Sequence, residues 1–435
     1  MIAVVGGGLS GLALSRELDL RGLDHVVLEA GDRAGGIVRS GRVRDRVLEW
    51  GPQRTRLTQP LRELVAELGI ENQLIPAPDD LSVFVYARGR LRRVPTTARE
   101  VLRSDLLGWR TRMRMALEPL TGGLRPDETA GAFLIRKFGR EAYDDMLGPL
   151  YGGLYASRPT DMPARFALAR TLSEFGVGRS VVLWLLRRSG EVPAACSFRD
   201  GMQTLTDALA RSAGSRLALR EAAGTITREG AELVVGTAGG PVRCRAVVLT
   251  LPADVAGGLV ARLDPEVASR LGRLRYNPLA VVHLLAAHGA DADAAGSGPR
   301  GLGYQVSFRE PLATRGVTWN DALFPGADRA GVYTAYLGGA AAPDVVGLPD
   351  DRLGALASEE FERVTGLAAE PISVARTRMP AWDHSWNALD GLRWPEGVHA
   401  CANWESRPGV PGRLAQARAV AASLAETLKP GSGAS

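Results

Sequence analysis

The N-terminal stretch "MIAVVGGGLSGLALSRELDLRGLDHVVLE" (residues 1–29) decides the fold. Its first five residues are apolar and predict a buried strand, which the following glycines end. "LALSRELDLRG" then carries leucines at helical spacing, and "HVVLE" predicts a second strand. A strand, turn, helix and strand within about thirty residues make a βαβ unit of the size used to bind dinucleotides.

The glycines of the first turn follow the pattern G-x-G-x-x-G at Gly6, Gly8 and Gly11. The first glycine permits a tight turn, the second lets a pyrophosphate approach the backbone, and the third lets helix and strand pack closely. The N-terminus of the helix then presents N–H groups to the phosphate. Glu29 ends the second strand, where a carboxylate can bond ribose hydroxyls and disfavours a 2′-phosphate. Together these features predict a bound dinucleotide.

The stretch "EAGDRAGGIV" (29–38) indicates which dinucleotide it is. Arg33 and the pair Gly35-Gly36 form a second loop, which we expect to fold back toward the phosphates. There arginine supplies charge and glycine allows close backbone approach. A nicotinamide cofactor has no evident need for this second loop, so we predict FAD. The residues expected to hold it are Gly6, Gly7, Gly8, Leu9, Ser10, Gly11, Glu29, Ala30, Arg33, Gly35, Gly36 and Ile37.

Composition narrows the classes of protein further. The chain has 435 residues, 45% hydrophobic and 23% charged, which predicts a globular protein of two interleaved lobes. The formal charge of +5 is almost all arginine, which suits phosphates, carboxylates or an anionic membrane surface. These arginines are scattered, so we expect no nucleic-acid partner.

The cysteines, the histidines and the hydropathy predict that the protein has no disulfide, no metal and no membrane span. Three cysteines far apart predict a reducing compartment without disulfides, and five histidines without a ligand-like pair predict no metal. No apolar run reaches the roughly 18 residues of a membrane span. The first strand begins at residue 1 or 2, which leaves no room for a signal peptide, so we expect a cytoplasmic protein.

The rest of the chain predicts an α/β fold: a Rossmann-like FAD-binding domain, an interleaved antiparallel-sheet substrate domain and a helical insert. Residues 215–255 predict a β-meander and then a buried parallel strand, and residues 276–340 predict an antiparallel sheet. "GVHACAN" predicts a last strand, followed by a helix over about 412–428, and 288–301 is the clear loop. The predicted FAD-binding domain comprises 1–75, 195–255 and 388–435, the substrate domain 76–97 and 256–387, and the insert 98–194.

At this point the chain resembles the FAD-dependent amine oxidase superfamily and, within it, the protoporphyrinogen oxidase (HemY-type) family. "VVGGGLSGLA" and "EAGDRAGGIVRS" carry the superfamily part. "LEWGPQRTRL" (48–57) looks like the Glu-x-Gly-Pro segment that lies beside the flavin in relatives. "YGGLYAS", "SFRDGMQTLTDAL", "GLGYQVS", "WNDALFPG", "TAYLGG" and "MPAWDHSW" follow in the family's order, and the resemblance runs nearly end to end.

This resemblance implies oxidation of a porphyrinogen to a porphyrin by repeated hydride transfers to the flavin, with molecular oxygen as the usual acceptor. The protein would mainly hold a flat tetrapyrrole against the flavin ring. The residues that it implies for the reacting site are Gly153, Leu302, Tyr336 and Leu337. Further flavin contacts implied by the family's segments are Gly51, Pro52, Gln53, Arg54, Trp386, Asn403, Pro408, Gly409 and Val410.

Two stretches depart from the family's pattern. In "ACANWESRPGVPGRL", Cys401 and Ser406 stand where relatives have glycines, and Arg407-Pro408 precedes the last helix. The strand "SVFVY" has Val83 where some relatives have a basic residue, for which Arg88, Arg90, Arg92 or Arg93 could substitute. Protoporphyrinogen IX and coproporphyrinogen III are both open as substrates. An amine oxidase with Tyr336 and Trp386 as paired aromatics, a carotenoid-type desaturase, and a flavin-fold protein without catalysis are the alternatives.

The helical insert resembles the membrane-dipping region of membrane-bound relatives. Its candidate interfacial side chains, flanked by arginines, are Trp109, Met113, Met115, Val181, Val182, Trp184 and Leu185. Peripheral contact with the inner face of the cell membrane, a homodimer contact and an ordinary core are all compatible with them. The sequence does not choose among these three.

Overall fold

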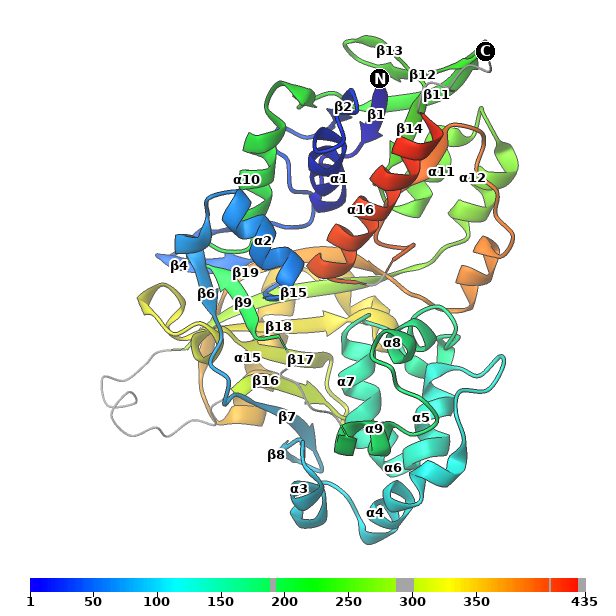
Figure 1. Ribbon diagram of the computed structural model, residues 1–435. Coiled ribbons are helices and arrows are strands. Elements are labelled where there is room, and N and C mark those ends of the chain that lie inside the picture. The colour runs from blue at the N-terminus through cyan, green and yellow to red at the C-terminus, as the bar shows by residue number, and fades with distance from the viewer. Residues whose placement is uncertain (188–192, 287–300, 407, 429–435) are drawn as a thin grey trace.

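The computed structural model describes residues 1–187, 193–286, 301–406 and 408–428. Figure 1 shows a parallel sheet near the N-terminus, a larger sheet across the middle, and a helical region below. This is the predicted α/β architecture. Outside the described residues lie most of the predicted loop at 288–301, Arg407 and the C-terminal tail.

A five-stranded parallel sheet brings together strands from distant parts of the chain. Its order is β10-β2-β1-β14-β20, so strands from the beginning, middle and end of the sequence are neighbours. The strands are β1 Ile2–Val5, β2 His25–Leu28, β10 Leu217–Ala218, β14 Ala246–Leu249 and β20 Val398–Ala400.

The two faces of this sheet are buried against different elements, because successive strand residues point to opposite sides. Ile2 and Val4 face a cluster with α1 (Leu9–Asp19) and α16 (Val410–Thr427). Ala3 and Val5 face the other way, toward the antiparallel meander β11 (Ala223–Glu229), β12 (Glu232–Thr237) and β13 (Gly240–Cys244). The predicted meander therefore begins at β11, since β10 pairs with β2 in the parallel sheet.

The larger sheet has seven strands in the order β19-β15-β18-β17-β16-β7-β8. Its pairs are antiparallel except β16 with β7, which is parallel. The strands are β7 Ser82–Ala87, β8 Arg90–Arg93, β15 Tyr276–Ala286, β16 Gly301–Val306, β17 Thr314–Trp319, β18 Val332–Gly338 and β19 Ala369–Pro380.

Helix α15 (Asp350–Thr365) covers one face of this sheet. Leu353, Ala357 and Phe361 of the helix form one apolar cluster with Val282 of β15 and Leu337 of β18. The opposite face carries polar side chains such as Thr318 and Thr334. That polar face is where the candidate site lies.

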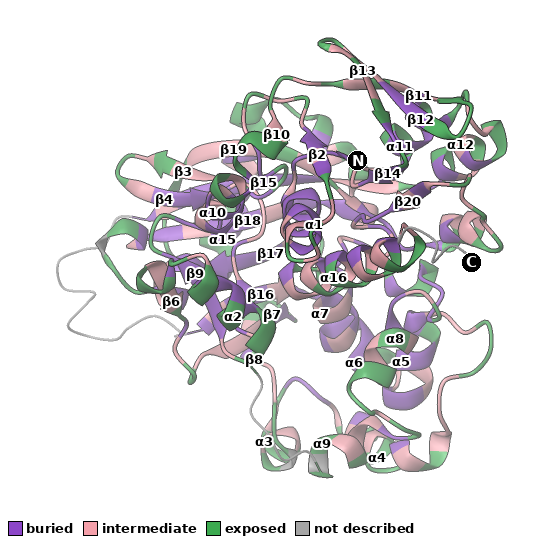
Figure 2. Ribbon diagram, turned by 45° about the horizontal axis from the view of Figure 1, so that its top comes forward, coloured by how far each residue is buried: buried purple, intermediate pink, exposed green. Residues whose placement is uncertain are grey.

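The helical region occupies the predicted insert and is coloured cyan to green in Figure 1. It comprises α3 Ala98–Arg103, α4 Trp109–Ala116, α5 Ala130–Phe138, α6 Arg140–Ala142, the π-helix η3 Tyr143–Leu147, α7 Gly148–Gly153, α8 Leu168–Glu174 and α9 Val181–Arg187. Figure 2 shows that α4 is largely exposed, whereas the strands of the two sheets are mostly buried. Within the described ranges, no helix has the length and apolar character needed to cross a bilayer.

Shorter elements connect these layers. Two small sheets pair β3 with β4 and place β9 between β5 and β6. Their strands are β3 Ser40–Val43, β4 Arg46–Glu49, β5 Thr55–Arg56, β6 Leu74–Pro76 and β9 Ala195–Phe198. Further α-helices in the described residues are α2 Gln59–Glu67, α10 Gln203–Ala213, α11 Ala253–Val260, α12 Pro265–Gly272 and α14 Asn320–Leu323.

Candidate cofactor and substrate site

The first glycine loop connects β1 to α1 and leaves no room for a side chain at its third glycine. A Cβ atom on Gly11 would lie 1.9 Å from the Gly6 carbonyl oxygen. Gly6 has φ +110°, a conformation that side-chain-bearing residues rarely adopt. The tight turn and the close helix–strand packing predicted for these two glycines are therefore both present.

The second glycine of this loop has a different environment. Gly8 is the N-cap of α1 and has no side chain to accept from the first N–H groups of the helix. The backbone of Gly8 lies beside that of Gly36, and a Cβ atom on Gly8 would stay 3.8 Å from the Gly36 Cα. The first amide groups of α1 thus face a space bordered by glycines, which suits a phosphate group.

Glu29 follows β2 and is held by the backbone of both loops. Its Oε2 accepts from the Gly7 N–H at 2.7 Å, and its Oε1 accepts from the Gly31 N–H at 2.8 Å. Each carboxylate oxygen can accept a further bond, so a ribose hydroxyl can still be bound. The same negative charge disfavours a phosphate at this position.

The second glycine loop folds back onto the first. The Gly35 N–H donates to the Gly7 carbonyl at 2.8 Å, and both Gly35 and Gly36 have positive φ. Arg33 braces this loop by donating to the carbonyls of Ala34 and Gly36 at 3.0 and 2.9 Å. The arginine thus shapes the loop, in addition to bringing a positive charge next to it.

The Glu-x-Gly-Pro segment lies directly against the second loop. A Cβ atom on Gly51 would lie 2.0 Å from the Ile37 carbonyl oxygen. The Ile37 side chain itself is 65% exposed, although it is large and apolar. Two glycine loops, the N-terminus of α1 without a side-chain cap, and the exposed Ile37 line one surface. A dinucleotide that covers this surface fits these features. The fold brings these predicted cofactor residues together, with Leu9, Ser10 and Ala30 beside them and Pro52 next to Gly51.

The C-terminal segment returns to the same side of the parallel sheet. Asn403 and Pro408 are partly buried, Gly409 is the exposed N-cap of α16 with φ +94°, and Val410 begins the helix. In the first turn of α16, Arg413 is buried and donates to the Ser406 carbonyl at 2.7 Å. Ser406, which stands where relatives have a glycine, therefore anchors this arginine.

Trp386 is enclosed by other tryptophans. Only 1% of it is exposed, its ring stacks on Trp382 at 5.4 Å, and its Nε1 donates to the Trp404 carbonyl at 3.0 Å. In the described part of the chain, no ring contact joins Trp386 to Tyr336. The two rings therefore do not touch each other, and their pairing against the flavin stays a prediction.

A buried polar network lies under the site, and the sequence analysis did not anticipate it. The Gln53 amide donates to the Glu49 carbonyl at 2.8 Å and accepts from the Asn320 amide at 2.7 Å. The Thr334 hydroxyl bonds both Gln53 and Asn320. Gln53 is thus a structural link between the cofactor segment and the large sheet. Asn320 and Thr334 lie more than 260 residues away from Gln53, so no local pattern could have shown these two partners.

Glu49 is the buried acid of this region. Its carboxylate accepts from the Ser40 hydroxyl at 2.5 Å and the Met202 N–H at 2.7 Å. Burial nevertheless raises the pKa of Glu49 to about 8, against the opposing effect of these bonds. The carboxyl group therefore carries its proton at neutral pH more readily than an exposed glutamate does.

The four residues predicted for the reacting site do not all share one surface. Tyr336 lies on the polar face of the seven-stranded sheet, and Gly153 ends α7 with its Cα toward Gln305 of that face. Leu302 packs instead against a small cluster with Leu323. Leu337 is fully buried on the α15 side, because it follows Tyr336 directly in the strand. The structure therefore does not place Leu337 in a pocket with Tyr336.

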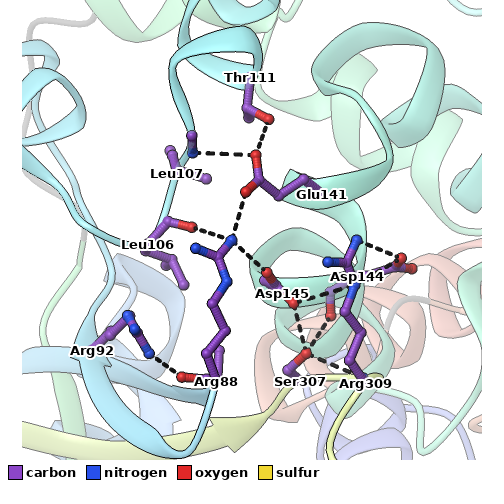
Figure 3. Close-up of polar contacts among 12 residues, drawn as sticks. Arg88, Arg92, Leu106, Leu107, Thr111, Glu141, Asp144, Asp145, Ser307 and Arg309 are labelled. Atoms are coloured by element: carbon purple, nitrogen blue, oxygen red, sulfur yellow. Dashed lines mark hydrogen bonds and ion pairs between the residues drawn. The ribbon is translucent and has the colours of Figure 1, made fainter.

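The arginines proposed as substitutes for a basic residue at Val83 are engaged elsewhere. Arg88 bonds Glu141 at 2.5 Å and the buried Asp145 at 3.1 Å, as Figure 3 shows. Arg92 donates to the Ala87 carbonyl and, with Arg90, pairs with Asp105, while Arg93 pairs with Glu100. These bonds fasten the β7–β8 hairpin to the helical region.

Comparison with known proteins defines the class. The family model described as flavin-containing amine oxidoreductase matches residues 9–395. The chain belongs to this family, and it is an oxidoreductase that uses a flavin.

Particular relatives resemble it over most of its length. The chloroplastic protoporphyrinogen oxidase of Nicotiana tabacum is 24% identical over 404 residues, covering 85% of this chain and 73% of the relative. Among solved structures, a protein of Exiguobacterium sp. 255-15, provisionally assigned as a protoporphyrinogen oxidase, matches with TM-score 0.78 and 22% identity over 98% of both chains. Cyclohexylamine oxidase from Brevibacterium oxydans matches with TM-score 0.72 and 16% identity over 99% of both. At these identities the two solved structures show a shared fold.

Proposed function

We propose that this protein binds FAD and oxidises a porphyrinogen to a porphyrin, with molecular oxygen as the electron acceptor. The observation that carries the substrate assignment is the likeness to protoporphyrinogen oxidases over 85% of the chain. The cofactor assignment rests on the two joined glycine loops with Glu29, whose geometry accommodates a diphosphate and a ribose.

The residues of this chain have separate tasks in the proposed reaction. The N-terminus of α1 and the loop at Gly35-Gly36 bind the diphosphate, and Glu29 binds the ribose hydroxyls. FAD held by these residues would supply the acceptor for hydride from the macrocycle, with oxygen as the final acceptor of the electrons. The polar face of the large sheet, with Tyr336, orients the macrocycle, and α7 covers it at Gly153. Since pyrrole protons can leave to solvent, the chain does not need a strong general base.

Purified protein tests both parts of this proposal. Flavin absorbance, with the mass of the cofactor released by heat, identifies FAD. Anaerobically prepared protoporphyrinogen IX and coproporphyrinogen III are then supplied with oxygen, and porphyrin fluorescence is followed. Oxidation of either above the rate of a heat-treated sample supports the function, and the ratio of the two kcat/KM values ranks the substrates. A protein with bound FAD that accelerates neither reaction contradicts it.

We further propose that the helical region contacts an anionic membrane surface peripherally. Trp109, Met113 and Leu120 are 70%, 56% and 82% exposed. Arg110 and Arg114 line the same shallow surface groove as Met113 and Leu120. Large exposed apolar side chains among arginines fit the interface of a bilayer with anionic lipids. Met115, Val181 and Val182, in contrast, pack against the protein core.

A further inference from the structure

A cluster of charged side chains joins the helical region to the large sheet. Its centre is Asp145, a buried residue of the π-helix η3. The Asp145 carboxylate accepts from the Ser307 hydroxyl at 2.9 Å and from the Arg88 guanidinium at 3.1 Å. The Nε of Arg309 lies 3.7 Å from the same carboxylate. Figure 3 shows Asp145 between Arg88 on one side and Ser307 with Arg309 on the other.

These partners come from three separate parts of the chain. Arg88 lies in the turn between β7 and β8, Asp145 in the helical region, and Ser307 directly after β16. The main chain makes the same connection, because the Asp144 carbonyl accepts from the Phe308 N–H at 3.0 Å and from the Ser307 hydroxyl at 3.2 Å. Side-chain and main-chain bonds therefore both tie the π-helix to the end of β16.

The π-helix leads directly into α7, which lies against β16 and the residues after it. A Cβ atom on Gly148, the first residue of α7, would lie 2.6 Å from the Phe308 ring. A Cβ atom on Gly153, the last residue, would lie 2.6 Å from the Gln305 Oε1. Helix and strand thus touch closely at both ends of α7. Asp145, three residues before Gly148, holds the end from which this helix starts.

The contact between α7 and β16 borders the polar face of the large sheet. Gln305 pairs with Gly316, and Gly316 pairs with Tyr336, so the three form one row across β16, β17 and β18. Gly153 stands at the end of this row and is exposed. The position of α7 over Gln305 therefore sets the width of the space beside the row. Small displacements of groups that orient a substrate can have large effects on its reaction.

The charges around Asp145 hold their positions firmly, because a buried carboxylate that loses its cation is left uncompensated. Arg88 also bonds Glu141 at 2.5 Å. Glu141 in turn accepts from the Gly108 N–H, at the start of α4, at 3.2 Å. The β7–β8 turn, α4, the π-helix and β16 thus meet in one network of bonds.

We propose that Asp145 is a positioning residue that fixes α7 on β16 through Arg88 and Ser307. It thereby determines how well the space between Gly153 and Gln305 distinguishes tetrapyrroles of different size. This inference rests on the proposed function and deepens it, since it assigns selection between substrates to charged residues outside the pocket. Asp145 itself touches neither substrate nor cofactor in this arrangement.

The test uses variants that remove, keep or relocate the charges. Asp145→Asn removes the anion, Arg88→Met removes the cation, and Arg88→Lys keeps it. A double exchange, Asp145→Ser with Ser307→Asp, returns a carboxylate to the same contact from the β16 side. Arg140→Met is the matched control, because Arg140 pairs with the neighbouring Asp144 but its side chain is 69% exposed.

Three properties are measured for each variant with its flavin bound. They are flavin content with melting temperature, kcat/KM for protoporphyrinogen IX and coproporphyrinogen III, and hydrogen exchange of the amides in α7. Loss of folded protein lowers both kcat/KM values by the same factor, so their ratio reports the shape of the pocket and not stability. Exchange in α10, which is remote from the cluster in the sequence, serves as the internal reference.

We expect Asp145→Asn and Arg88→Met to change the ratio of the two kcat/KM values by about 2- to 30-fold, as for residues that act on a ligand without touching it. Exchange in α7 should become faster, with normal flavin content and unchanged exchange in α10. Arg88→Lys and the double exchange should restore the wild-type ratio in part. If Asp145→Asn does not fold, Arg88→Met decides, because the Arg88 side chain is 40% exposed. An unchanged ratio or unchanged exchange in α7 would overturn the inference, as would an equal effect of Arg140→Met.

Failure of the proposed function is recognised separately. If the wild type binds FAD but oxidises neither porphyrinogen, the proposed reaction is wrong, whereas hydrogen exchange still reports the position of α7. The oxidised porphyrins then serve as probes, and their binding is followed by fluorescence quenching. A changed ratio of their two dissociation constants in Arg88→Met, with faster exchange in α7, supports positioning by Asp145. If the wild type binds neither porphyrin, the inference is overturned as well.

Discussion

Substitutions at the second and third glycines of the first loop, Gly8 and Gly11, should separate folding from cofactor binding. Gly8→Ala places a methyl group where the nearest atom is 3.8 Å away, and Gly8 has φ −72° and ψ −179°, an extended conformation open to alanine. Restricting the unfolded chain stabilises by about 0.4–1 kcal/mol, and alanine's weakness as an N-cap costs a similar amount. The free energy of unfolding of the apoprotein should therefore change by less than about 1 kcal/mol.

Gly11→Ala is the contrasting substitution, because it should disrupt folding, whereas Gly8→Ala should not. Its methyl carbon would start 1.9 Å from the Gly6 carbonyl oxygen, whereas ordinary contact begins near 3.4 Å. The obstacle is backbone, so α1 would have to move away from β1. Overpacking of this kind costs about 3 kcal/mol or more, and loss of the βαβ unit would follow.

The assay combines a thermal melt of the apoprotein with flavin absorbance after incubation with FAD. We expect Gly8→Ala to melt within about 3 °C of the wild type and to bind little or no flavin, because the methyl group occupies the space of the diphosphate. Gly11→Ala should melt at a lower temperature or fail to fold. A Gly8→Ala protein with normal melting and full flavin content would refute the placement of the diphosphate over this loop.

Three further predictions concern stability and surfaces. Between about pH 4.5 and 8 the folded protein retains a proton on Glu49 that the unfolded chain releases. Its stability should therefore fall as pH rises through this window, and denaturation of Glu49→Gln at several pH values should show a shallower decline. Lys137 and Glu118, both fully buried, are bonded at 2.5 Å. Lys137→Met should then destabilise by about 3–5 kcal/mol in urea denaturation, and adding Glu118→Gln should recover part of this; equal stability of both variants would contradict the pairing. Met113→Glu with Leu120→Glu should abolish co-sedimentation with phosphatidylglycerol vesicles at unchanged melting temperature, and equal binding of wild type and variant would rule out this surface.

The parts of the molecule that depend on local chemistry could be predicted from the sequence. The two glycine loops and Glu29 lie within 38 residues, so their spacing carried the prediction of the fold and the cofactor class. α16, expected over about 412–428, runs from Val410 to Thr427. Contacts between distant segments could not be predicted in this way. The Gln305 amide lies against Gly153 and Gly316, where side chains at those residues would leave it no room. Gln53 accepts hydrogen bonds from Asn320 and Thr334. Leu337 was grouped with Tyr336 because the two are adjacent, although strand alternation sends them to opposite faces.

The pairing of β20 with β14 and the packing of α16 on α1 have a consequence for synthesis of the chain. The first glycine loop leaves the ribosome early, but the strand at the end of its sheet comes from residues 398–400. At about 5–20 residues per second, this strand is made roughly 20–80 s after the first glycine loop. Until then the apolar surface of α1 has no C-terminal helix to cover it. A chain truncated before residue 398 therefore cannot complete its parallel sheet, and nascent chains of this protein should depend on chaperones until α16 has been made.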